Sequence, residues 1–482
     1  MKRLLLCLIF AALAALLMLR VRESDKRRED GEPPPAKVFA PPLPVWQQAL
    51  EQAFQKAKED PALAGATVGF CLLDAGGKVL FEQNGHASMI PASTLKTVTT
   101  ATALEKWGPD HRLETRLLAK APAQEGVIAG DVVMRGGGDP MLALEDLAVW
   151  AGRLHTEGVR KITGRIIGDG SLFPGSLYGD FWGWGDIGNG YGSGVAGLNL
   201  EHNRCGVKFD AGAAEGDAAV FAGAEPEVPG VVWINETKTG AEGSGDGIMI
   251  HGGERTGRLF LRGTVPLGAR GFAVQGAVPD PELYAAHHLK LALARVGIAV
   301  DGEAITAASL REKGEALPVH DEVLLKHESP PLIEIITSIH ATSDNHETDC
   351  LYHWLGVGGR EGPAEVIRKH WQERGLAFSG LRMVDGCGLS RADFIRPLDL
   401  ALLQQKAVSG PQGALYKESL LASRDGSVRW KGGAMSAVRS YTGLVSTASG
   451  EELAFALMVN HFGDSQPVGA LRDAVLEAVK KH

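Results

Sequence analysis

The spacing of apolar residues changes twice along the chain, and each change marks a different kind of predicted structure. After residue 44, apolar residues at helical spacing predict a helix over Val45–Lys58, and short apolar runs predict strands over Thr67–Leu73 and Lys78–Glu82. Pro91 precedes a further helical pattern from Ser93 to Trp107, and proline is favoured at the start of a helix. This part of the chain is therefore predicted to be mixed α/β.

Between about residues 112 and 320 the pattern consists of short β-like runs separated by glycine-rich turns. The strands predicted there are Asp131–Met134, Arg165–Gly168, Ala219–Ala222, Val231–Ile234 and Leu259–Leu261. One helix is predicted in this stretch, over Pro281–Val296. The composition agrees with many tight turns, because 62 of the 482 residues are glycine.

Helical spacing returns after about residue 328, with helices predicted over Pro331–Thr342, His346–Leu355, Pro363–Arg374 and Pro397–Val408. Strands over Val428–Gly432, Ala437–Val445 and Leu453–Asn460 and a final helix over Val468–Lys480 complete the pattern. A β-rich middle between two mixed flanks predicts an α/β (α+β) fold in which an insert splits one domain. The predicted parts are an apolar segment (1–21), a linker (22–44), the split domain (45–111 and 321–482) and the insert (112–320).

The N-terminus has the features of an export signal. Lys2 and Arg3 precede an apolar run from Leu4 to Leu19, which ends at Arg20. The run has 16 residues, just below the ~18 expected of a membrane span. A cleaved signal peptide and an uncleaved inner-membrane anchor are therefore both open, and either places the rest of the chain in the periplasm or cell envelope. Residues 22–44 are charged and then proline-rich, which predicts an extended linker.

Charge and cysteine spacing exclude two classes of partner. With 49 basic and 58 acidic residues, the net charge is −9 and no basic cluster is present, so we expect no nucleic acid. The cysteines beyond the apolar run are scattered without a C-x-x-C pair, so we expect no zinc site. Burial as small apolar residues is the commonest state of such cysteines, and a disulfide cannot be deduced from their positions.

Ser93 and Lys96 are three residues apart on a predicted helix and therefore share one face. A serine hydroxyl becomes a good nucleophile when a nearby base removes its proton, and a desolvated lysine can be that base. This pair alone occurs often by chance, and a helix cap followed by an exposed lysine is its more common explanation. Two further groups of residues change that balance.

Ser343-Asp344-Asn345 lies in a break between two predicted helices, and Lys431-Gly432-Gly433 begins a predicted strand. The order Ser-x-x-Lys, Ser-x-Asn, Lys-x-Gly is typical of penicillin-binding proteins and serine β-lactamases. The chance of all three occurring in this order and in these local contexts is small. We therefore predict a serine hydrolase of this type.

The chain resembles the D-alanyl-D-alanine carboxypeptidase/endopeptidase family, the class C low-molecular-weight penicillin-binding proteins, over residues 45–482. Further stretches carry the resemblance: Gly136–Pro140, Gly164–Asp169 with Ser171 and Phe173, Asp385–Arg391 and Asp425–Ser427. The 250 residues between Ser93 and Ser343 also fit, because this family has a large insertion there. The resemblance implies a penicillin-recognising serine-hydrolase fold of the β-lactamase/transpeptidase type, with no metal and no organic cofactor.

The resemblance also implies an acyl-enzyme reaction on peptidoglycan stem peptides, with β-lactams as covalent inhibitors. Ser93 would attack the carbonyl between two D-alanine units, and Lys96 would be the base that activates it. Ser343 would pass a proton to the leaving amine, Asn345 would hold the peptide amide, and Lys431 would add positive charge near the substrate carboxylate. Backbone N–H groups of Ser93 and of the strand after Lys431 would stabilise the oxyanion.

Four further residues are implied to bind the substrate. Gly432 and Gly433 would lie on the strand beside it, and Asp169 and Phe173 would approach the free end of its diamino-acid side chain. A structural turn is the rival interpretation for Asp169 and Phe173, and we expect Asp385–Arg391 to be a structural turn beneath the site.

The sequence departs from the family at Lys431-Gly432-Gly433-Ala434, where Lys-Thr-Gly-Thr/Ser is usual. Both hydroxyls that would help hold the terminal carboxylate are missing, which should weaken its binding by ~1–3 kcal/mol if nothing replaces them. Two alternatives to a D-Ala-D-Ala hydrolase therefore stay open. One is a catalytically weakened peptidoglycan-binding protein, and the other is a β-lactamase or esterase on the same fold.

Two histidine patterns do not predict a metal site. His346-Glu347-Thr348-Asp349-Cys350 begins like H-E-x-x-H but has cysteine where the second histidine must stand. The pair His287-His288 has no acidic residue at ligand spacing nearby in sequence.

Overall fold

The computed structural model describes residues 16, 18 and 20 and the stretch 43–482. The predicted signal peptide or anchor, Leu4–Leu19, and the linker over 22–44 lie almost entirely outside the described residues. Among the helices that are described, none is both long and apolar enough to cross a membrane. Trp46–His482 forms one compact unit.

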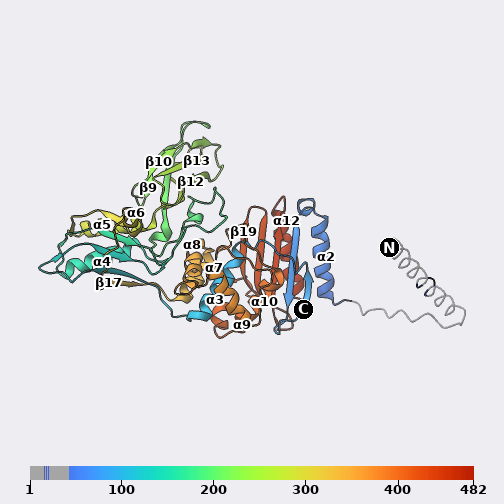
Figure 1. Cartoon of the computed structure of the whole chain (residues 1–482). Helices are drawn as coiled ribbons and strands as arrows, with labels where there is room; N and C mark the ends of the chain where they lie inside the picture. Colours follow the sequence, from blue (N-terminus) through green and yellow to red (C-terminus); the bar gives the residue numbers. More distant parts are fainter. Residues whose placement is uncertain (1–15, 17, 19, 21–42) are drawn as a thin grey trace, which may run out of the picture. The chain divides into compact units, whose positions relative to one another are not determined.

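A six-stranded antiparallel sheet joins the two ends of this unit (Figure 1). Its order is β18-β19-β20-β21-β1-β2. The strands are β1 (Thr67–Leu73), β2 (Val79–Gln83), β18 (Leu421–Ala422), β19 (Val428–Met435), β20 (Val438–Ser446) and β21 (Glu452–Asn460). Strand β1 pairs with β21 from Thr67 opposite Asn460 to Leu73 opposite Ala454. The first strand of the unit thus lies beside its last strand.

Alternate residues of β1 face opposite sides of the sheet, as the period of a strand requires. Phe70 and Leu72 pack with α2 (Val45–Glu59) and α12 (Gln466–Val479). Cys71 and Leu73 belong to the core on the other side. That side is covered by α3 (Lys96–Trp107), α7 (Leu332–Thr342), α8 (Asn345–Leu355), α9 (Pro363–Glu373), α10 (Pro397–Val408) and α11 (Gly413–Ser419). Short 3-10 turns lie at Pro61–Leu63 (η1) and Ala92–Leu95 (η2).

The chain leaves this domain along β3 (Glu114–Ala119) and returns along β17 (Glu322–Glu328), and these two strands pair antiparallel. They end a five-stranded sheet of order β16-β7-β5-β3-β17, whose other strands are β5 (Val132–Arg135), β7 (Ile166–Asp169) and β16 (Ala304–Thr306). A smaller sheet contains β4 (Val127–Ile128), β6 (Lys161–Ile162) and β15 (Ala299–Val300). Helices α4 (Leu144–Thr156) and α5 (Pro281–Arg295) pack into the core of this layer, and α6 (Ala307–Glu312) packs on its own small cluster.

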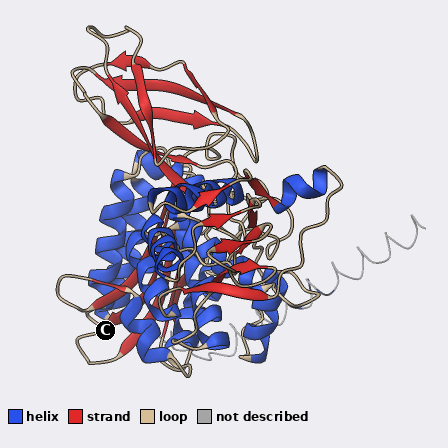
Figure 2. Cartoon of the chain, turned by 90° about the vertical axis from the view of Figure 1, so that its left-hand side faces the viewer, coloured by secondary structure: helices blue, strands red, loops and turns tan. Residues whose placement is uncertain are grey.

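The remaining part of the insert consists of strands and loops, seen at the top of Figure 2. One sheet there has the order β14-β8-β9, and a second has β10-β13-β11 with β12 also paired to β13. Their bounds are β8 (Arg204–Asp210), β9 (Val220–Glu225), β10 (Val232–Asn235), β11 (Lys238–Gly240), β12 (Gly247–His251), β13 (Arg258–Pro266) and β14 (Phe272–Ala277). Two 3-10 turns, η3 (Gly190–Gly192) and η4 (Glu201–Asn203), precede β8.

The expectation of a single helix in the insert is wrong, because α4 and α6 are present in addition to α5. The signal for α4 was available, since Leu147, Trp150, Ala151 and Leu154 are all buried and stand at helical spacing. The helix predicted from Ser93 begins instead as η2 and becomes α-helical at Lys96. The insert boundaries at 112 and 320 stay predictions.

Candidate active site

Ser93 lies in the turn that leads into the helix carrying Lys96. The Nζ of Lys96, the first residue of α3, lies 3.0 Å from the Oγ of Ser93, and the Lys96 side chain is fully buried. Ala92, immediately before Ser93, has φ of 46°, in a region that residues with a side chain rarely adopt. The backbone at Ser93 is therefore held by its surroundings rather than by local preference.

The amine of Lys96 contacts three oxygen atoms whose chemistry differs. It lies 2.6 Å from the Oδ1 of Asn345 and 2.8 Å from the carbonyl oxygen of Cys387, in addition to Ser93 Oγ. The amide and peptide oxygens can only accept hydrogen bonds, whereas the hydroxyl of Ser93 can also donate one. When this amine is deprotonated it keeps two N–H bonds for the two acceptor oxygens, and its lone pair is then left for Ser93. The geometry suits transfer of the Ser93 proton to Lys96.

Ser343 and Asn345 reach the same place from the break between α7 and α8. Ser343 follows α7 in the left-handed conformation, with φ of 62°, and Asp344 caps α8 by accepting the N–H of Glu347 at 3.0 Å. Asn345 is the first residue of α8. Its Nδ2 donates to the carbonyl of Tyr191 at 2.8 Å, so its amide is held on both sides, by Tyr191 and by Lys96.

Lys431 approaches from strand β19. Its Nζ donates to Ser343 Oγ at 2.8 Å and to the carbonyl of Gly432 at 2.9 Å, and only 2% of the residue is exposed. Burial, together with the nearby charge of Lys96, lowers the pKa of Lys431 to about 7. The lysine hydrogen-bonded to Ser343 therefore exchanges its proton near neutral pH.

The two glycines after Lys431 differ in what surrounds them. A Cβ on Gly433 would lie 2.8 Å from the backbone nitrogen of Ser93 and 2.9 Å from the carbonyl oxygen of Pro91. A Cβ on Gly432 would meet nothing closer than the Tyr441 ring, at 3.8 Å. Glycine at 433 is thus required by the close approach of β19 to Ser93, whereas 432 has room for a side chain.

These groups meet at one pocket of about 420 Å³. Its lining residues are Ser93, Asp186, Tyr191, Ser343, Asn345, Gly388, Leu389, Arg391, Ala434, Met435 and Ser436. Lys96 and Lys431 are buried and contact Ser93, Asn345 and Ser343 from within the protein. The lining contains one acidic side chain, Asp186, and one guanidinium, Arg391, whose Nη2 donates to the carbonyl of Ser436 at 2.9 Å.

Residues 50–479 match the model of the D-Ala-D-Ala carboxypeptidase 3 (S13) family. The chain belongs to this family. The predicted resemblance is thereby confirmed, and so is the assignment to the serine peptidases of this type.

Two curated proteins illustrate how far the S13 relatives extend along the chain. The D-alanyl-D-alanine carboxypeptidase of Actinomadura sp. is 29% identical over 459 residues, covering 88% of this chain and 83% of its own. The D-alanyl-D-alanine carboxypeptidase DacB of Haemophilus influenzae is 26% identical over 424 residues, covering 83% of this chain and 86% of its own. Both matches span the insert as well as the split domain.

Solved structures show the same fold. The crystal structure of penicillin binding protein 4 from Haemophilus influenzae superposes with a TM-score of 0.79 at 21% identity, over 90% of this chain and 99% of that one. A structure of that protein complexed with a β-lactam superposes with a TM-score of 0.73 at 20% identity, over the same shares of the two chains. The predicted penicillin-recognising fold is confirmed.

Asp169 and Phe173 do not line the Ser93 pocket of this S13 protein. The buried carboxylate of Asp169 accepts the Nε–H of Arg135 at 3.0 Å and the backbone N–H of Ser171 at 3.1 Å. Phe173 stacks on His353, with ring centroids 5.4 Å apart, in a separate hollow. Their positions favour the structural interpretation over contact with the substrate.

Several residues at the site were missed in the sequence. Asp186 comes from the loop before η3, Tyr191 comes from η3 itself, and Arg391 ends a turn that we expected to be structural. That turn is held by Asp385, whose Oδ1 accepts the N–H of Gly388 at 2.6 Å, and it also supplies the Cys387 carbonyl to Lys96. The one available signal was the density of aromatic residues between 178 and 191.

Two clusters have ligand types that could hold a metal, but the chemistry around them opposes it. In His202–Asp344–Glu347, both carboxylate oxygens of Asp344 already accept hydrogen bonds from Arg204, whose positive charge would repel a cation. In Asp349–Asp385–Cys387, backbone N–H groups and the Cys387 thiol already occupy the carboxylate oxygens. His346 is buried against Asn203 and Asn199, so it is not part of a zinc motif.

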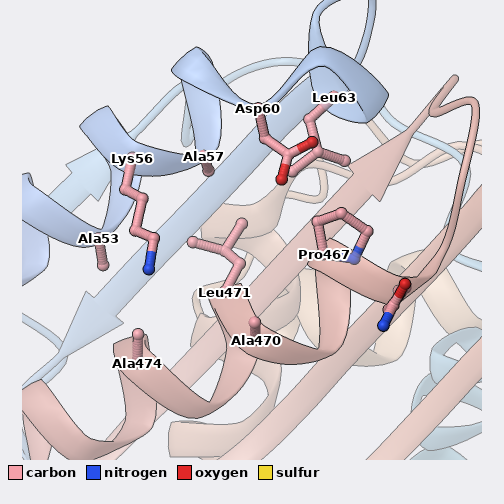
Figure 3. Close-up of a pocket in the computed structure, with 10 residues that line it drawn as sticks. Ala53, Lys56, Ala57, Asp60, Leu63, Pro467, Ala470, Leu471 and Ala474 are labelled. Atoms are coloured by element: carbon pink, nitrogen blue, oxygen red, sulfur yellow. The ribbon is translucent and has the colours of Figure 1, made fainter.

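A second hollow, of about 360 Å³, lies between α2 and α12 on the opposite face of the six-stranded sheet (Figure 3). Its lining is mostly small and apolar, with Lys56, Asp60 and Gln466 as the polar residues. It contains no serine, cysteine or histidine, so it offers no nucleophile for the chemistry above. The four cysteines in the described stretch, Cys71, Cys205, Cys350 and Cys387, are all buried and free.

Proposed function

We propose that this chain is a serine-type D-Ala-D-Ala carboxypeptidase and endopeptidase that cleaves peptidoglycan stem peptides through an acyl-enzyme. The observation that carries the proposal is the 3.0 Å contact between Ser93 Oγ and the buried amine of Lys96, in a pocket that Ser343 and Asn345 also line. Membership of the S13 family and relatives named D-alanyl-D-alanine carboxypeptidase support the substrate class.

In the acylation step, Ser93 Oγ bonds to the carbonyl carbon of the penultimate D-alanine while its proton passes to Lys96. The backbone N–H groups of Ser93 and Ala434, which both line the pocket, stabilise the negative charge on the carbonyl oxygen. The carbon–nitrogen bond then breaks, and the leaving amine takes the proton of Ser343. Lys431, hydrogen-bonded to Ser343, replaces that proton and becomes neutral, which its pKa of about 7 permits.

In the deacylation step, a water molecule adds to the ester carbonyl and gives a proton through Ser343 to Lys431. The bond to Ser93 breaks, and Ser93 Oγ recovers its proton from Lys96. Both lysines return to their starting charge, and the products are the shortened peptide acid and D-alanine. A β-lactam acylates Ser93 in the same way, but its opened ring stays attached, so the ester persists.

The pocket offers charges for both ends of the substrate. Arg391 and Ser436 lie on the lining beside Ala434, where the terminal carboxylate needs partners that Gly432 and Ala434 lack. Arg439, another candidate for this role, donates instead to the carbonyls of Met435 and Val438 and does not line this pocket. We assign to Asp186, which lines the pocket, the role that the sequence suggested for Asp169, namely binding the cationic end of the stem side chain.

A weaker enzyme is the second candidate, and it rests on the methyl group of Ala434. This side chain lines the pocket where a hydroxyl is usual in the family, so the terminal carboxylate loses a directed hydrogen bond. Acylation by β-lactams would remain, with slow turnover of D-Ala-D-Ala ends. A β-lactamase or esterase on this fold has no observation of its own in support.

The proposed location is the cell envelope, either periplasmic or held at the inner membrane by the apolar run Leu4–Leu19. The support is the basic and apolar pattern of the first 20 residues, together with the S13 family's substrate class. Intact mass of the mature protein isolated from its host would distinguish a cleaved signal from an anchor.

Intact mass spectrometry after exposure to benzylpenicillin tests the acyl-enzyme. The wild type should gain the mass of one inhibitor molecule, and Ser93→Ala should gain none while keeping its circular dichroism spectrum. Hydrolysis of a synthetic D-Ala-D-Ala peptide then separates a peptidase from a weakened binder. An adduct on the alanine variant would show that the nucleophile is another residue.

A further inference from the structure

All the exposed aromatic side chains of residues 43–482 belong to one loop. Phe181, Trp184 and Tyr191 are 67%, 65% and 45% exposed, and every other phenylalanine, tryptophan or tyrosine in that stretch is at least partly buried. The loop, residues 178–191, has five aromatic residues in fourteen, whereas aromatics make up 6% of the whole chain. Apolar surface concentrated in this way marks a binding surface.

Both of the most exposed rings are supported from one side. The indole of Trp184 stacks on His251 of β12, with centroids 6.1 Å apart and an angle of 14° between the planes. The guanidinium of Arg382 lies 5.3 Å from the centre of the Phe181 ring. Each ring is therefore held in place on one face while most of its surface stays open. A ligand that stacks on the open faces would lose little side-chain entropy, because the rings are already ordered.

The same loop forms part of the catalytic pocket. Asp186 and Tyr191 line that pocket, and the Tyr191 hydroxyl donates to Asp186 at 3.2 Å. The base of the loop is fixed by Trp182, whose Nε1 donates to Asp385 at 2.8 Å. Trp184 is two residues from Asp186, so one of the open rings is carried by the same short stretch of the loop that lines the pocket.

We propose that Phe181 and Trp184 are a stacking site for the pyranose rings of the glycan strand that carries the stem peptide. This inference rests on the proposed function, since it concerns the part of the same substrate that lies outside the pocket. A pyranose ring has an apolar C–H face and polar hydroxyl edges. The loop matches this pattern with flat rings next to the polar groups of His251, Arg382 and Asp186.

The composition of the loop favours sugar over a membrane or a protein partner. Ile187 is the only aliphatic residue larger than alanine between 178 and 191, and five of the fourteen residues are glycine. A membrane-binding or protein-binding surface would present a contiguous aliphatic area. Here the apolar surface consists of separate rings divided by glycine.

The test compares two substrates that share one peptide. One is the free stem pentapeptide, and the other is the same peptide attached to a short strand of N-acetylglucosamine and N-acetylmuramic acid. Trp184→Ala and Phe181→Ala are compared with Val149→Ala, a control at an exposed position of α4. The wild type should have the higher kcat/KM on the glycan-bearing substrate. The loop variants should lose about tenfold of that preference and keep the rate on the free peptide.

Three outcomes decide the question. If the loop variants lose kcat/KM equally on both substrates, or lose none on the glycan-bearing substrate, the stacking site is overturned. Weaker binding of the same variants to lipid vesicles, with the substrate preference unchanged, would assign the loop to a membrane instead. If the wild type hydrolyses neither substrate, the proposed function fails, and calorimetric titration with peptide-free glycan strands then tests the stacking site by itself. Binding that is lost in Trp184→Ala would support the stacking site. Absence of binding to the wild type would overturn it.

Discussion

The guanidinium of Arg204 donates two hydrogen bonds to the carboxylate of Asp344, at 2.6 and 3.1 Å. Arg204 belongs to the insert, and Asp344 lies between Ser343 and Asn345 of the proposed catalytic site. The Nε of Arg204 also donates to the carbonyl of Gly190, next to the residue that holds the Asn345 amide. Although burial would raise the pKa of Asp344, Arg204 lowers it far below its ordinary value. The insert thus fixes the loop that carries two of the proposed catalytic groups.

The backbone before Arg204 is strained in a way that supports this role. Glu201, His202 and Asn203 all have positive φ, at 53°, 53° and 54°. Such residues cost roughly 1–2 kcal/mol each for a chain of L-amino acids. The same turn places His202 3.0 Å from Glu347 and Asn203 3.0 Å from His346, so all three contacts hold the start of α8.

Arg204→Lys should reduce the rate of acylation by benzylpenicillin by about tenfold or more. Lysine keeps the charge but cannot donate two parallel hydrogen bonds to one carboxylate. Arg262→Lys is the matched control, because Arg262 pairs with Glu236 on the exposed surface of the insert. Stopped-flow acylation kinetics and a thermal melt are measured on each. A folded Arg204→Lys protein with wild-type acylation would show that the insert does not position the site.

Lys96→Arg should lose acylation even though the positive charge is kept. The guanidinium stays protonated at any pH at which the protein is folded, so it cannot accept the Ser93 proton. The readout is the mass of the penicillin adduct after long incubation. Near-normal labelling of this variant would mean that another group is the base.

Gly433→Ala and Gly432→Ala form a matched pair with opposite expectations. The added methyl at 433 collides with backbone atoms of Pro91 and Ser93, so acylation should fall by at least a hundredfold, with a destabilisation of about 1–3 kcal/mol. The methyl at 432 meets only the Tyr441 ring at 3.8 Å, so the acylation rate and the stability should both change little. Penicillin labelling and urea denaturation are measured on both. Equal effects of the two substitutions would contradict the close approach of β19 to Ser93.

Lys431 should make the stability of the protein depend on pH above neutrality. Its pKa of about 7 in the folded state lies below the ordinary 10.5. Between these values the unfolded chain binds more protons than the folded one, so the free energy of unfolding rises with pH. Lys431→Met removes this contribution. The difference in unfolding free energy, wild type minus variant, should therefore increase between about pH 7 and 10 in urea titrations. A difference that does not change with pH would contradict the depressed pKa.

Ala434→Thr and Gly432→Thr test whether the missing hydroxyls weaken recognition of the carboxylate. Position 434 lines the pocket and 432 has room for a side chain, and threonine suits a strand. Either substitution should raise kcat/KM on a D-Ala-D-Ala peptide by about fivefold to a hundredfold, the equivalent of ~1–3 kcal/mol. Penicillin acylation serves as the reference reaction. Unchanged turnover in folded variants would mean that Arg391 or Ser436 already holds the carboxylate.

The spacing of apolar residues was sufficient to predict most of the helices and strands that form the split domain. Strand β1 has the predicted bounds Thr67–Leu73, because its last five residues form a continuous buried run that ends where Asp74 follows. The motif order also identified Ser93, Lys96, Ser343, Asn345 and Lys431 as candidates, since each lies in or next to a helix or strand that the spacing of apolar residues could locate. In the structure, Lys96 is hydrogen-bonded to Ser93 and Asn345, and Lys431 is hydrogen-bonded to Ser343.

Contacts across the insert could not be predicted in the same way. Asp186 lies in an irregular loop, Tyr191 lies in the short turn η3, and Arg204 directly follows the strained turn 201–203, so no periodic pattern marks any of them. Asp169 was assigned to the substrate by resemblance, but its ion pair with Arg135 depends on the parallel pairing of β5 with β7. That pairing is a long-range property of the chain and leaves no local trace.

The pairing of β1 with β21 has a consequence for the synthesis of this protein. The nucleophile and its base emerge early, but the backbone N–H of Ile90 is satisfied only by the side chain of Asn460, 370 positions later. Contacts this far apart in sequence form late, and a chain that stops before Glu452 leaves β1 without its partner. We therefore expect acyl transfer only from molecules whose last strand has been made. Truncated chains would keep Ser93 and Lys96 without the completed sheet, so we expect unfinished copies of the hydrolase to leave the wall intact.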